Sequence, residues 1–528
     1  MFWIIIGILL LILFYFLCVK PYSFWKSRGV AQQQTWLIGD LLQMIFTKRP
    51  YPQIIRDQYN AFPNERYIGM YQFGFPALIA RDLDLIKQIT VKDFDHFTDH
   101  ITFFPESVEP LWTRNLFSLK GEKWRDIRAT LSPAFTSSKM RSMFTLMDEC
   151  AEEFVKFFAE QKKDVVDVEL KDIFTRFAND IIGTCAFGFQ CNSMKDRENE
   201  FYMMGDELTD FKGLWKSFKF ILSIASPKMS ELLRFSIFNK NTIGFFEKAI
   251  SQSVQMRKEK NIVRPDMIHL LMEAGEGRLK HEESLTEKET GFATVEESEV
   301  GKSTKRQKSE ITIKDITAHA LFFFFAGFDS VSTLMIFLGY ELALHPDIQE
   351  RLRNEIDDAM KETNGKVTYD SVTKMKYLDM IISETLRKWP GTVANDRVCV
   401  KPYTVTPVNP GEPEIKFNVG DSVMLPVYGL HMDPNHFENP DKFDPERFSE
   451  ENKVKIKPYS YMPFGLGPRS CIGSRFALLE TKVVYVHLLK KFEIVVINKT
   501  DIPLPLVTTG FNFLAKNGVW VGLKPRNK

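Results

Sequence analysis

The strongest constraint on this chain is a glycine-rich loop around one cysteine, in the stretch Phe464–Gly473. The loop reads Phe-Gly-Leu-Gly-Pro-Arg-Ser-Cys-Ile-Gly. Gly465 and Gly467 permit tight turns and let the backbone approach another group closely. After Gly473, apolar residues recur at helical spacing. We therefore expect Cys471 to lie on a rigid loop that leads into the N-terminus of a helix.

This position gives Cys471 a chemical role. Backbone N–H groups and the positive end of a helix stabilise a thiolate. A thiolate on a loop shaped for a flat partner is suited to be an axial ligand of haem iron. Arg469 would then be placed to hydrogen-bond a haem propionate. A lone cysteine is more often a small buried hydrophobe, so the prediction depends on the whole pattern.

The pattern Phe-x-x-Gly-x-Arg-x-Cys-x-Gly resembles the haem-binding loop of the cytochrome P-450 superfamily of haem-thiolate monooxygenases. The resemblance implies that Phe464, Arg469 and Cys471 bind haem b, with Cys471 as the axial ligand of the iron. It also implies a mainly α (α+β) fold, in which one helical domain with small β-sheets surrounds the haem. Details of the sequence look most like insect microsomal members of the detoxifying type.

Composition narrows the function further. The chain has 69 Lys and Arg against 68 Asp and Glu, so it offers no basic excess for nucleic acid. Its 46 Phe residues suit apolar ligands, although core packing explains most of them. The six cysteines form no Cys-x-x-Cys pair, which argues against a zinc site. They are too sparse for a disulfide framework, which favours a reducing compartment.

The N-terminus predicts a membrane anchor. Phe2–Val19 is uncharged, almost wholly apolar and just long enough to span a bilayer. A cleavable signal peptide is the alternative, but no charge precedes the run and no Ala-x-Ala follows it. Lys20 places the C-terminal flank in the cytosol, and Trp25 is expected at the membrane interface. We predict an anchor over residues 1–20 in the endoplasmic reticulum membrane, and a stem over 21–50.

The remainder, residues 51–528, is predicted to be one catalytic domain on the cytosolic side. Residues 67–80 mix turns with β-rich sequence and indicate a small sheet. Residues 273–310 are rich in Glu, Lys, Gly, Ser and Thr. Such a segment cannot bury enough apolar surface to offset its ordering entropy. We interpret it as a flexible, charged surface insert within the domain.

Trp124 and Arg128 are predicted to share one face of a helix, because they are four residues apart. Taken alone, this spacing is equally typical of a surface pair. In the resembling family a Trp-x-x-x-Arg at this place hydrogen-bonds the haem propionates. The resemblance therefore implies that Trp124 and Arg128 bind haem, and it implies the same for Arg397.

Residues 311–344 indicate one long buried helix, which carries Gly327, Asp329 and Ser330 in its apolar middle. Two readings remain open. In one, the helix packs tightly at Gly327 and Ser330 bonds back to a carbonyl. In the other, a distorted turn faces a ligand and Asp329 and Ser330 relay protons. The segment resembles the oxygen-activating helix Ala-Gly-x-(Asp/Glu)-Thr, with serine in place of the usual threonine.

Glu384 and Arg387 lie three residues apart, so a helix would place both on one face. In the resembling family, such a pair joins a second arginine in a buried network near the haem loop. By resemblance, Arg447 is that arginine. His431 precedes Met-Asp-Pro in a metal-like sequence, but we expect a satisfied surface histidine there.

Several aromatic segments are candidates for the substrate pocket. Phe103, Phe104 and 111–117 lie before the helix of Trp124, where the family covers the substrate, and core packing is an equal alternative. Residues 211–246 contain two aromatic helical stretches around a break. By resemblance they form a mobile lid that also contacts the membrane. Residues 393–395 are implied to line the pocket.

The resemblance implies insertion of one oxygen atom of O₂ into a lipophilic substrate. The chain shows no nucleotide-binding glycine fingerprint after a strand, so electrons must come from another protein. By resemblance this is NADPH–cytochrome reductase, with cytochrome b5 as a second donor, docking on the Cys471 side. The alternatives are a haem-thiolate isomerase or lyase that needs no reductase, and a haem-binding sensor or carrier without catalysis.

Overall fold

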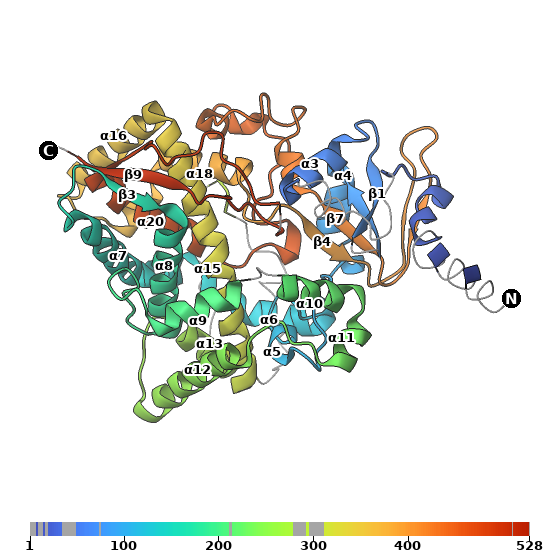
Figure 1. Cartoon of the computed structure of the whole chain (residues 1–528), viewed down its shortest axis with the longest axis horizontal. Coiled ribbons are helices and arrows are strands. Elements are labelled where there is room, and N and C mark those ends of the chain that lie inside the picture. The colour runs from blue at the N-terminus through green and yellow to red at the C-terminus, as the bar shows by residue number, and fades with distance from the viewer. Residues whose placement is uncertain are drawn as a thin grey trace.

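The computed structural model describes residues 7–8, 14–15, 20–33, 49–72, 75–210, 214–277, 292–294, 311–508 and 510–526. Most of the predicted anchor, and residues 34–48 of the predicted stem, lie outside the described residues. Figure 1 shows the N-terminus at one end of the long axis, close to a small sheet, and the C-terminus at the opposite end. Most of the helices lie between these two ends (Figure 1).

The described residues are mainly helical. The helices are α3 (Tyr51–Asn60), α4 (Leu83–Lys87), α5 (Pro110–Thr113), α6 (Gly121–Leu131), α7 (Ser137–Ala159), α8 (Leu170–Ile182), α9 (Glu200–Thr209), α10 (Leu214–Ala225), α11 (Pro227–Leu233), α12 (Lys240–Lys260), α13 (Met267–Gly275), α15 (Ile313–Leu344), α16 (Pro346–Glu362), α17 (Tyr369–Thr373), α18 (Lys376–Lys388), α19 (Val427–His431) and α20 (Ser474–Lys491). Short helical turns are η2 (Lys20–Ser23), η3 (Lys26–Arg28), η4 (Gln88–Lys92), η5 (Phe94–His96), η6 (Ser132–Phe135), η7 (Gly183–Phe187), η9 (Pro445–Phe448), η10 (Lys453–Lys455) and η11 (Gly467–Arg469).

Three small sheets complete the fold. The strands are β1 (Tyr67–Gln72), β2 (Phe75–Ala80), β3 (Val166–Glu169), β4 (Asn395–Val398), β5 (Tyr403–Val405), β6 (Ile415–Phe417), β7 (Ser422–Leu425), β8 (Phe492–Val495) and β9 (Trp520–Pro525). The largest sheet has the order β1-β2-β7-β4, in which only β2 and β7 run parallel. The others are β3-β9-β8 and β5-β6. The hairpin β1–β2 confirms the sheet that residues 67–80 predicted.

The central element is α15, which crosses the molecule and packs most closely against α8 (Figure 1). The Thr312 hydroxyl accepts a bond from the Asp315 N–H, and the Asp315 carboxylate accepts from the Thr312 N–H. This capping box satisfies donors that the first helical turn leaves open. Within the described residues α15 alone is long and apolar enough to cross a membrane, yet it is mostly buried in the protein core. Its apolar length therefore serves core packing.

Two predicted details differ from the structure. Trp25 is buried rather than placed at a membrane interface, because its ring lies over Gly69 and its Nε1 donates to Met70 O at 2.9 Å. The charged insert begins later than predicted, because α13 continues to Gly275. Inside the predicted insert, the Phe292 N–H donates to Asp379. Residues 278–291 and 295–310 lie outside the described residues.

Candidate active site

The loop before α20 is folded by glycines and backbone hydrogen bonds. Gly465 and Gly467 have positive φ values of 76° and 67°. The Cys471 N–H donates to the Phe464 carbonyl at 2.8 Å, which closes the loop. A Cβ at Gly467 would lie 1.9 Å from the carbonyl oxygen of Thr90, so only glycine fits. Cys471 is therefore presented on a short, closed loop just before α20, as predicted.

The environment of the Cys471 sulfur is mixed. Its side chain is accessible to solvent, yet burial of the residue in the surrounding protein raises the pKa of its thiol. The Gly473 N–H and the Arg128 guanidinium act in the opposite direction and lower the pKa of Cys471. The interactions expected to stabilise a thiolate are thus present, but they lower the pKa of Cys471 by less than desolvation raises it. A bound metal cation would reverse this balance, because a coordinating thiol is deprotonated outright.

Three arginines lie close to this loop in the protein interior. Arg128 donates from Nη1 to the Ser470 carbonyl at 2.9 Å. Arg397 donates from Nη2 to the Leu466 carbonyl at 3.1 Å, and its buried Nε has no hydrogen-bond partner. Burial lowers the pKa of Arg397 to about 10, and burial and the nearby Arg397 lower the pKa of Arg469 to about 9. Such clustered cations favour an anionic ligand.

Arg469 has a second function in this structure. Its guanidinium lies 4.0 Å from the centre of the Trp124 ring. It donates to four backbone carbonyls of one preceding segment: those of Thr98, Leu116, Phe117 and Leu119. Arg469 therefore connects the cysteine loop to residues 98–119, in addition to its predicted role with a propionate.

His100 is a residue of this region that the sequence did not indicate. Its Nδ1 lies 3.1 Å from Asp396 Oδ1, and its ring stacks on Phe117 at 4.4 Å. Burial lowers the pKa of His100. Asp396 and Arg397 are adjacent in β4, so His100 belongs to the same polar cluster. No sequence signal could have found it, because 296 residues separate it from Asp396.

The predicted reactive residues of α15 lie on a regular helix. Ser330 Oγ donates to the Ala326 carbonyl at 2.5 Å, and the Ser330 side chain is exposed. A Cβ on Gly327 would meet Ile182 of α8 at 3.0 Å, so glycine permits the close packing of these helices. The helix is not distorted here, and these contacts match the packing interpretation. An accessible hydroxyl in the middle of a buried helix nevertheless remains available to a ligand.

The predicted network of Glu384, Arg387 and Arg447 forms at the C-terminal end of α18. Glu384 and Arg387 are fully buried and form two hydrogen bonds, of 2.7 and 2.8 Å. Arg447 Nε reaches Glu384 Oε1 at 3.4 Å, and the Asp444 N–H donates to the same oxygen at 2.9 Å. The network joins α18 to η9.

The expectation of a surface histidine at position 431 is wrong. His431 is completely buried. Its Nδ1 pairs with the Arg387 carbonyl at 3.1 Å, and its Nε2 accepts from the Met462 N–H at 3.0 Å. Burial, followed by the charge of Arg387, lowers the pKa of His431 to about 3. Both ring nitrogens have hydrogen-bond partners, as expected. Through them His431 links α18 to the start of the cysteine loop.

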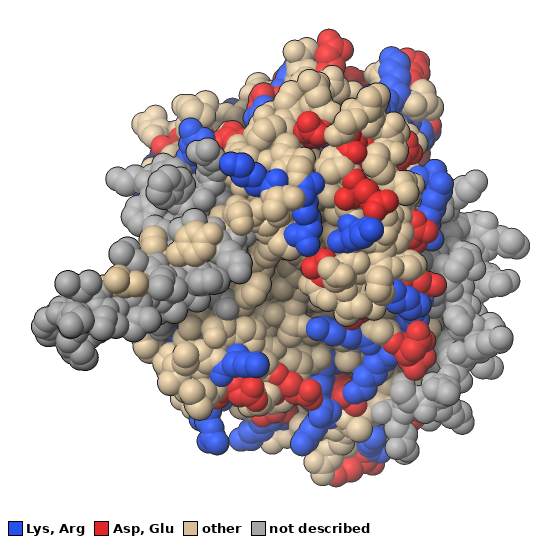
Figure 2. Space-filling model, turned by 90° about the vertical axis from the view of Figure 1, so that its right-hand side faces the viewer, with Lys and Arg blue, Asp and Glu red and all other residues tan. Residues whose placement is uncertain are grey.

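Aromatic side chains connect α15 with the segments that cover it. Phe117 stacks on Phe322 of α15 at 5.9 Å, and Phe103 packs on both Phe117 and Phe220 of α10. Trp112 meets Phe325 of α15 at 4.9 Å. Residues 101–119 and α10 thus lie over the Phe322 side of α15. Figure 2 shows the face near the N-terminus, where largely uncharged surface is hollowed near its middle.

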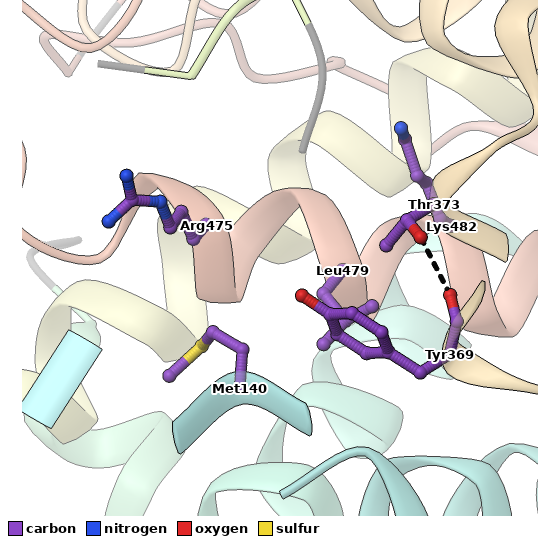
Figure 3. Close-up of a pocket in the computed structure, with 6 residues that line it drawn as sticks. All are labelled: Met140, Tyr369, Thr373, Arg475, Leu479 and Lys482. Atoms are coloured by element: carbon purple, nitrogen blue, oxygen red, sulfur yellow. Dashed lines mark hydrogen bonds between the residues drawn. The ribbon is translucent and has the colours of Figure 1, made fainter. Parts of the chain in front are cut away.

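A separate cavity, little larger than a water molecule, lies beside α20 and is lined by Met140, Tyr369, Thr373, Arg475, Leu479 and Lys482 (Figure 3). The charged ends of Arg475 and Lys482 point away from the Tyr369 hydroxyl (Figure 3). Lys482 is instead paired with Asp379 at 3.1 Å. This cavity brings no reactive groups together and is not a candidate site.

The donor set fits haem b. Among the described residues, no group of three His, Cys, Asp or Glu side chains could hold a bare metal ion. A single cysteine therefore suits a metal that is already coordinated by a cofactor, as haem iron is by its porphyrin, and that needs only one ligand from the protein. The arginine cluster, with the orphaned Nε of Arg397, suits two propionates. The structure brings Arg397, Arg469, Trp124 and Arg128 to the Cys471 loop, whereas Glu384 and Arg387 join it through His431.

Comparisons with known proteins agree with this site. The family model described as Cytochrome P450 matches residues 31–520. "Cytochrome P450 9e2" from Blattella germanica is 42% identical over 521 residues, which cover 96% of this chain and 94% of the relative. "Probable cytochrome P450 9f2" from Drosophila melanogaster is 42% identical over 526 residues, which cover 98% and 97%. "Cytochrome P450 9b2" from Drosophila melanogaster is 38% identical over 513 residues, which cover 96% and 93%. The resemblance to insect members is confirmed, and the chain belongs to the cytochrome P450 family of haem-thiolate monooxygenases.

Proposed function

We propose that this monooxygenase oxidises lipophilic small molecules at the endoplasmic reticulum membrane. Its electrons come from NADPH through a separate NADPH–cytochrome reductase, with cytochrome b5 as a second donor. The observation that carries the substrate class is the aromatic cover of α15, which includes Phe103, Phe117 and Phe322. An aromatic lining with few polar groups selects apolar ligands.

Each predicted site residue has a separate task in this proposal. Cys471 would coordinate the iron, and Phe464 closes the loop because its carbonyl accepts from the Cys471 N–H. When bound, the haem supplies the activation of O₂, which thiolate ligation favours. Trp124, Arg128, Arg397 and Arg469 would hold the haem propionates by hydrogen bonds, those of the arginines being charge-assisted.

Proton delivery is assigned to α15. Ser330 Oγ holds a proton at an accessible position, and Asp329 lies next to it on the helix. A serine hydroxyl can exchange its bond to the Ala326 carbonyl for a bond to a water molecule by rotation about χ1. Glu384, Arg387 and Arg447 touch no ligand in this scheme, and they keep α18 and the cysteine loop in place.

The test is product analysis with the complete protein in lipid vesicles. The protein is incubated with reductase, NADPH, isotopically labelled O₂ and a panel of lipophilic compounds. We expect a product that carries one labelled oxygen atom and requires both reductase and NADPH. Conversion of hydroperoxides without reductase would favour the isomerase or lyase instead. A substrate-induced spectral shift without any product would favour a sensor or carrier.

A further inference from the structure

One buried carboxylate connects two segments that cover α15. Residues 101–119, here called the cover loop, carry Glu109 directly before α5. Residues 214–239, the lid segment, comprise α10, α11 and the turn that leads to α12. Glu109 is 6% exposed, although glutamate is almost never buried unless it is paired. The catalytic scheme above gives this side chain no role.

The hydrogen-bond partners of the Glu109 carboxylate all lie on the lid segment. Glu109 Oε1 accepts from Ser236 Oγ at 2.7 Å and from the Ile237 N–H at 2.9 Å. The Phe238 N–H is 3.4 Å from the same oxygen. Lys219 of α10 donates to the Ser236 carbonyl at 3.0 Å, so the turn is also fastened to α10. Burial raises the pKa of Glu109, whereas the three donors and the charge of Lys219 oppose this rise.

Aromatic contacts surround this polar link. Phe238 stacks on Trp112 at 4.4 Å and meets Phe104 at 5.6 Å. Ser223 of α10 donates to the Phe103 carbonyl at 3.0 Å. Apolar stacking can slide with little change in energy, whereas a carboxylate with three donors is directional. The directional contacts that position the lid segment on the cover loop are therefore the three donors to Glu109 and the single Ser223 bond to Phe103.

The cover loop is itself held from the other side. Arg469 donates to the carbonyls of Thr98, Leu116, Phe117 and Leu119. A continuous set of contacts therefore runs from the cysteine loop through Arg469 to the cover loop, and through Glu109 to the lid segment. Arg469 makes three of these bonds to the cover loop and the fourth to Thr98 just before it, so the contacts with the lid segment are the ones that can open.

We propose that Glu109 is the residue that controls access to the active site, because it latches the lid segment to the cover loop. This inference rests on the proposed function, since it assumes that ligands reach the haem beneath this cover. Opening requires the Glu109 bonds and the single Ser223–Phe103 bond to break, after which α10 and α11 can move away from Phe103 and Phe104. Glu109 does not touch the ligand in this proposal, so it sets rates of entry and exit rather than equilibrium affinity.

The first test measures hydrogen exchange in the complete protein, which requires no substrate. Glu109→Ala should speed amide exchange at Ile237, Phe238 and α10–α11, with exchange in α16 unchanged. Glu106→Ala is the matched control, because Glu106 is an exposed glutamate in the same loop. Unchanged exchange at Ile237 and Phe238, or a uniform increase throughout the chain, would overturn the latch. This readout stays valid even if the catalytic proposal fails.

The second test follows entry of 1-phenylimidazole, a lipophilic azole, into haem-loaded protein by stopped-flow absorbance. Association and dissociation rate constants should both rise about tenfold in Glu109→Ala, the size expected for a lost charge-assisted hydrogen bond. The dissociation constant should hardly change. A changed dissociation constant with unchanged rates would contradict an access role. If Glu109→Ala does not fold, Ser236→Ala and Glu109→Gln must show smaller changes in the same direction, and unchanged rates in both would overturn the proposal.

Discussion

Gly467 shows how one missing side chain sets the path of the cysteine loop. Its φ is +67°, and a Cβ there would lie 1.9 Å from the Thr90 carbonyl oxygen. A backbone atom cannot move aside as the end of a flexible side chain can. Gly420 has a similar positive φ of 97°, but nothing lies within 4 Å of its Cβ position. Both glycines adopt a left-handed conformation, but only Gly467 is also sterically blocked. A comparison of the two therefore distinguishes the steric effect of a Cβ from its effect on backbone conformation.

We expect Gly467→Ala to destabilise the protein more than Gly420→Ala does. The control carries only the left-handed strain, about 1–2 kcal/mol. The loop variant also forces the chain away from Thr90, which adds about 1–3 kcal/mol of overpacking. Urea unfolding would measure the stability, and the carbon monoxide difference spectrum would measure haem incorporation. Equal losses in the two variants would show that the contact with Thr90 is unimportant.

Ser330 can be tested without disturbing α15, since alanine is the best helix former. In Ser330→Ala we expect peroxide release per NADPH oxidised to increase severalfold, because a methyl group cannot hold a proton. Ser330→Thr keeps the hydroxyl and should remain close to the wild-type protein. Peroxide and NADPH would be measured together during reconstituted turnover. Identical coupling in all three proteins would remove Ser330 from proton delivery.

Between elements, the buried Glu384–Arg387 pair joins α18 to η9. Removal of Arg387 leaves the buried Glu384 carboxylate with only the longer 3.4 Å contact to Arg447 and one backbone N–H donor, from Asp444. We expect Arg387→Ala to cost about 3–5 kcal/mol and to abolish haem incorporation. The measurements are urea unfolding and the carbon monoxide difference spectrum.

Arg351→Ala is the matched control for this variant. Arg351 of α16 also pairs with a glutamate, Glu446, but both side chains are about half exposed. Surface pairs of this kind contribute about 0–1 kcal/mol. A normal haem spectrum in Arg387→Ala would refute the structural role assigned to the network.

The elements differ in how well the sequence predicts them. The predicted limits of α15 are within two residues of those observed, because a long apolar run is a local signal. The cysteine loop is likewise encoded by its own glycines. Contacts such as Glu109 with Ser236 join residues 127 apart, and no local pattern specifies them. His431 was misplaced because sequence alone does not reveal how deeply a short helix is buried.

For the whole molecule, buried histidines make stability depend on pH. The pKa of His431 is about 3 in the folded protein, against an ordinary value of 6.5. The unfolded chain therefore binds more protons between these values, and the stability from His431 is lost as the pH falls below 6.5. At pH 5 the loss amounts to about 2 kcal/mol, from 1.36 kcal/mol per pKa unit.

We expect His431→Gln to remove the pH-dependent stability that arises from His431, since glutamine does not titrate. The variant should be less stable at pH 7, because the paired ring is lost. Between pH 7 and pH 5, its disadvantage relative to the wild-type protein should shrink by about 2 kcal/mol. Urea unfolding of both proteins at the two pH values would measure this. A difference in stability that stays constant with pH would mean that His431 titrates normally in the folded state.

The orientation of the whole protein on a membrane can also be argued from exposed apolar residues. On α11, Leu232 is 77% exposed and its neighbour Leu233 is 47% exposed, while Trp215 of α10 is 60% exposed. Both helices lie in the half of the molecule that carries the N-terminus (Figure 1). An anchor at that end would bring α10 and α11 against the same bilayer. Contact with lipid would bury side chains that the protein itself leaves in water.

We therefore expect a chain that begins at residue 21 to retain binding to phospholipid vesicles, and Leu232→Glu to weaken it. Burial of one leucine is worth about 1.5–3 kcal/mol, so the partition coefficient should fall by at least about tenfold. Val454 of η10 is also 77% exposed, which makes Val454→Glu a control of equal exposure and charge. Vesicle co-sedimentation would measure the binding. Equal losses in the two variants would show that charge alone weakens binding, and that the face formed by α10 and α11 is not the one that meets the lipid.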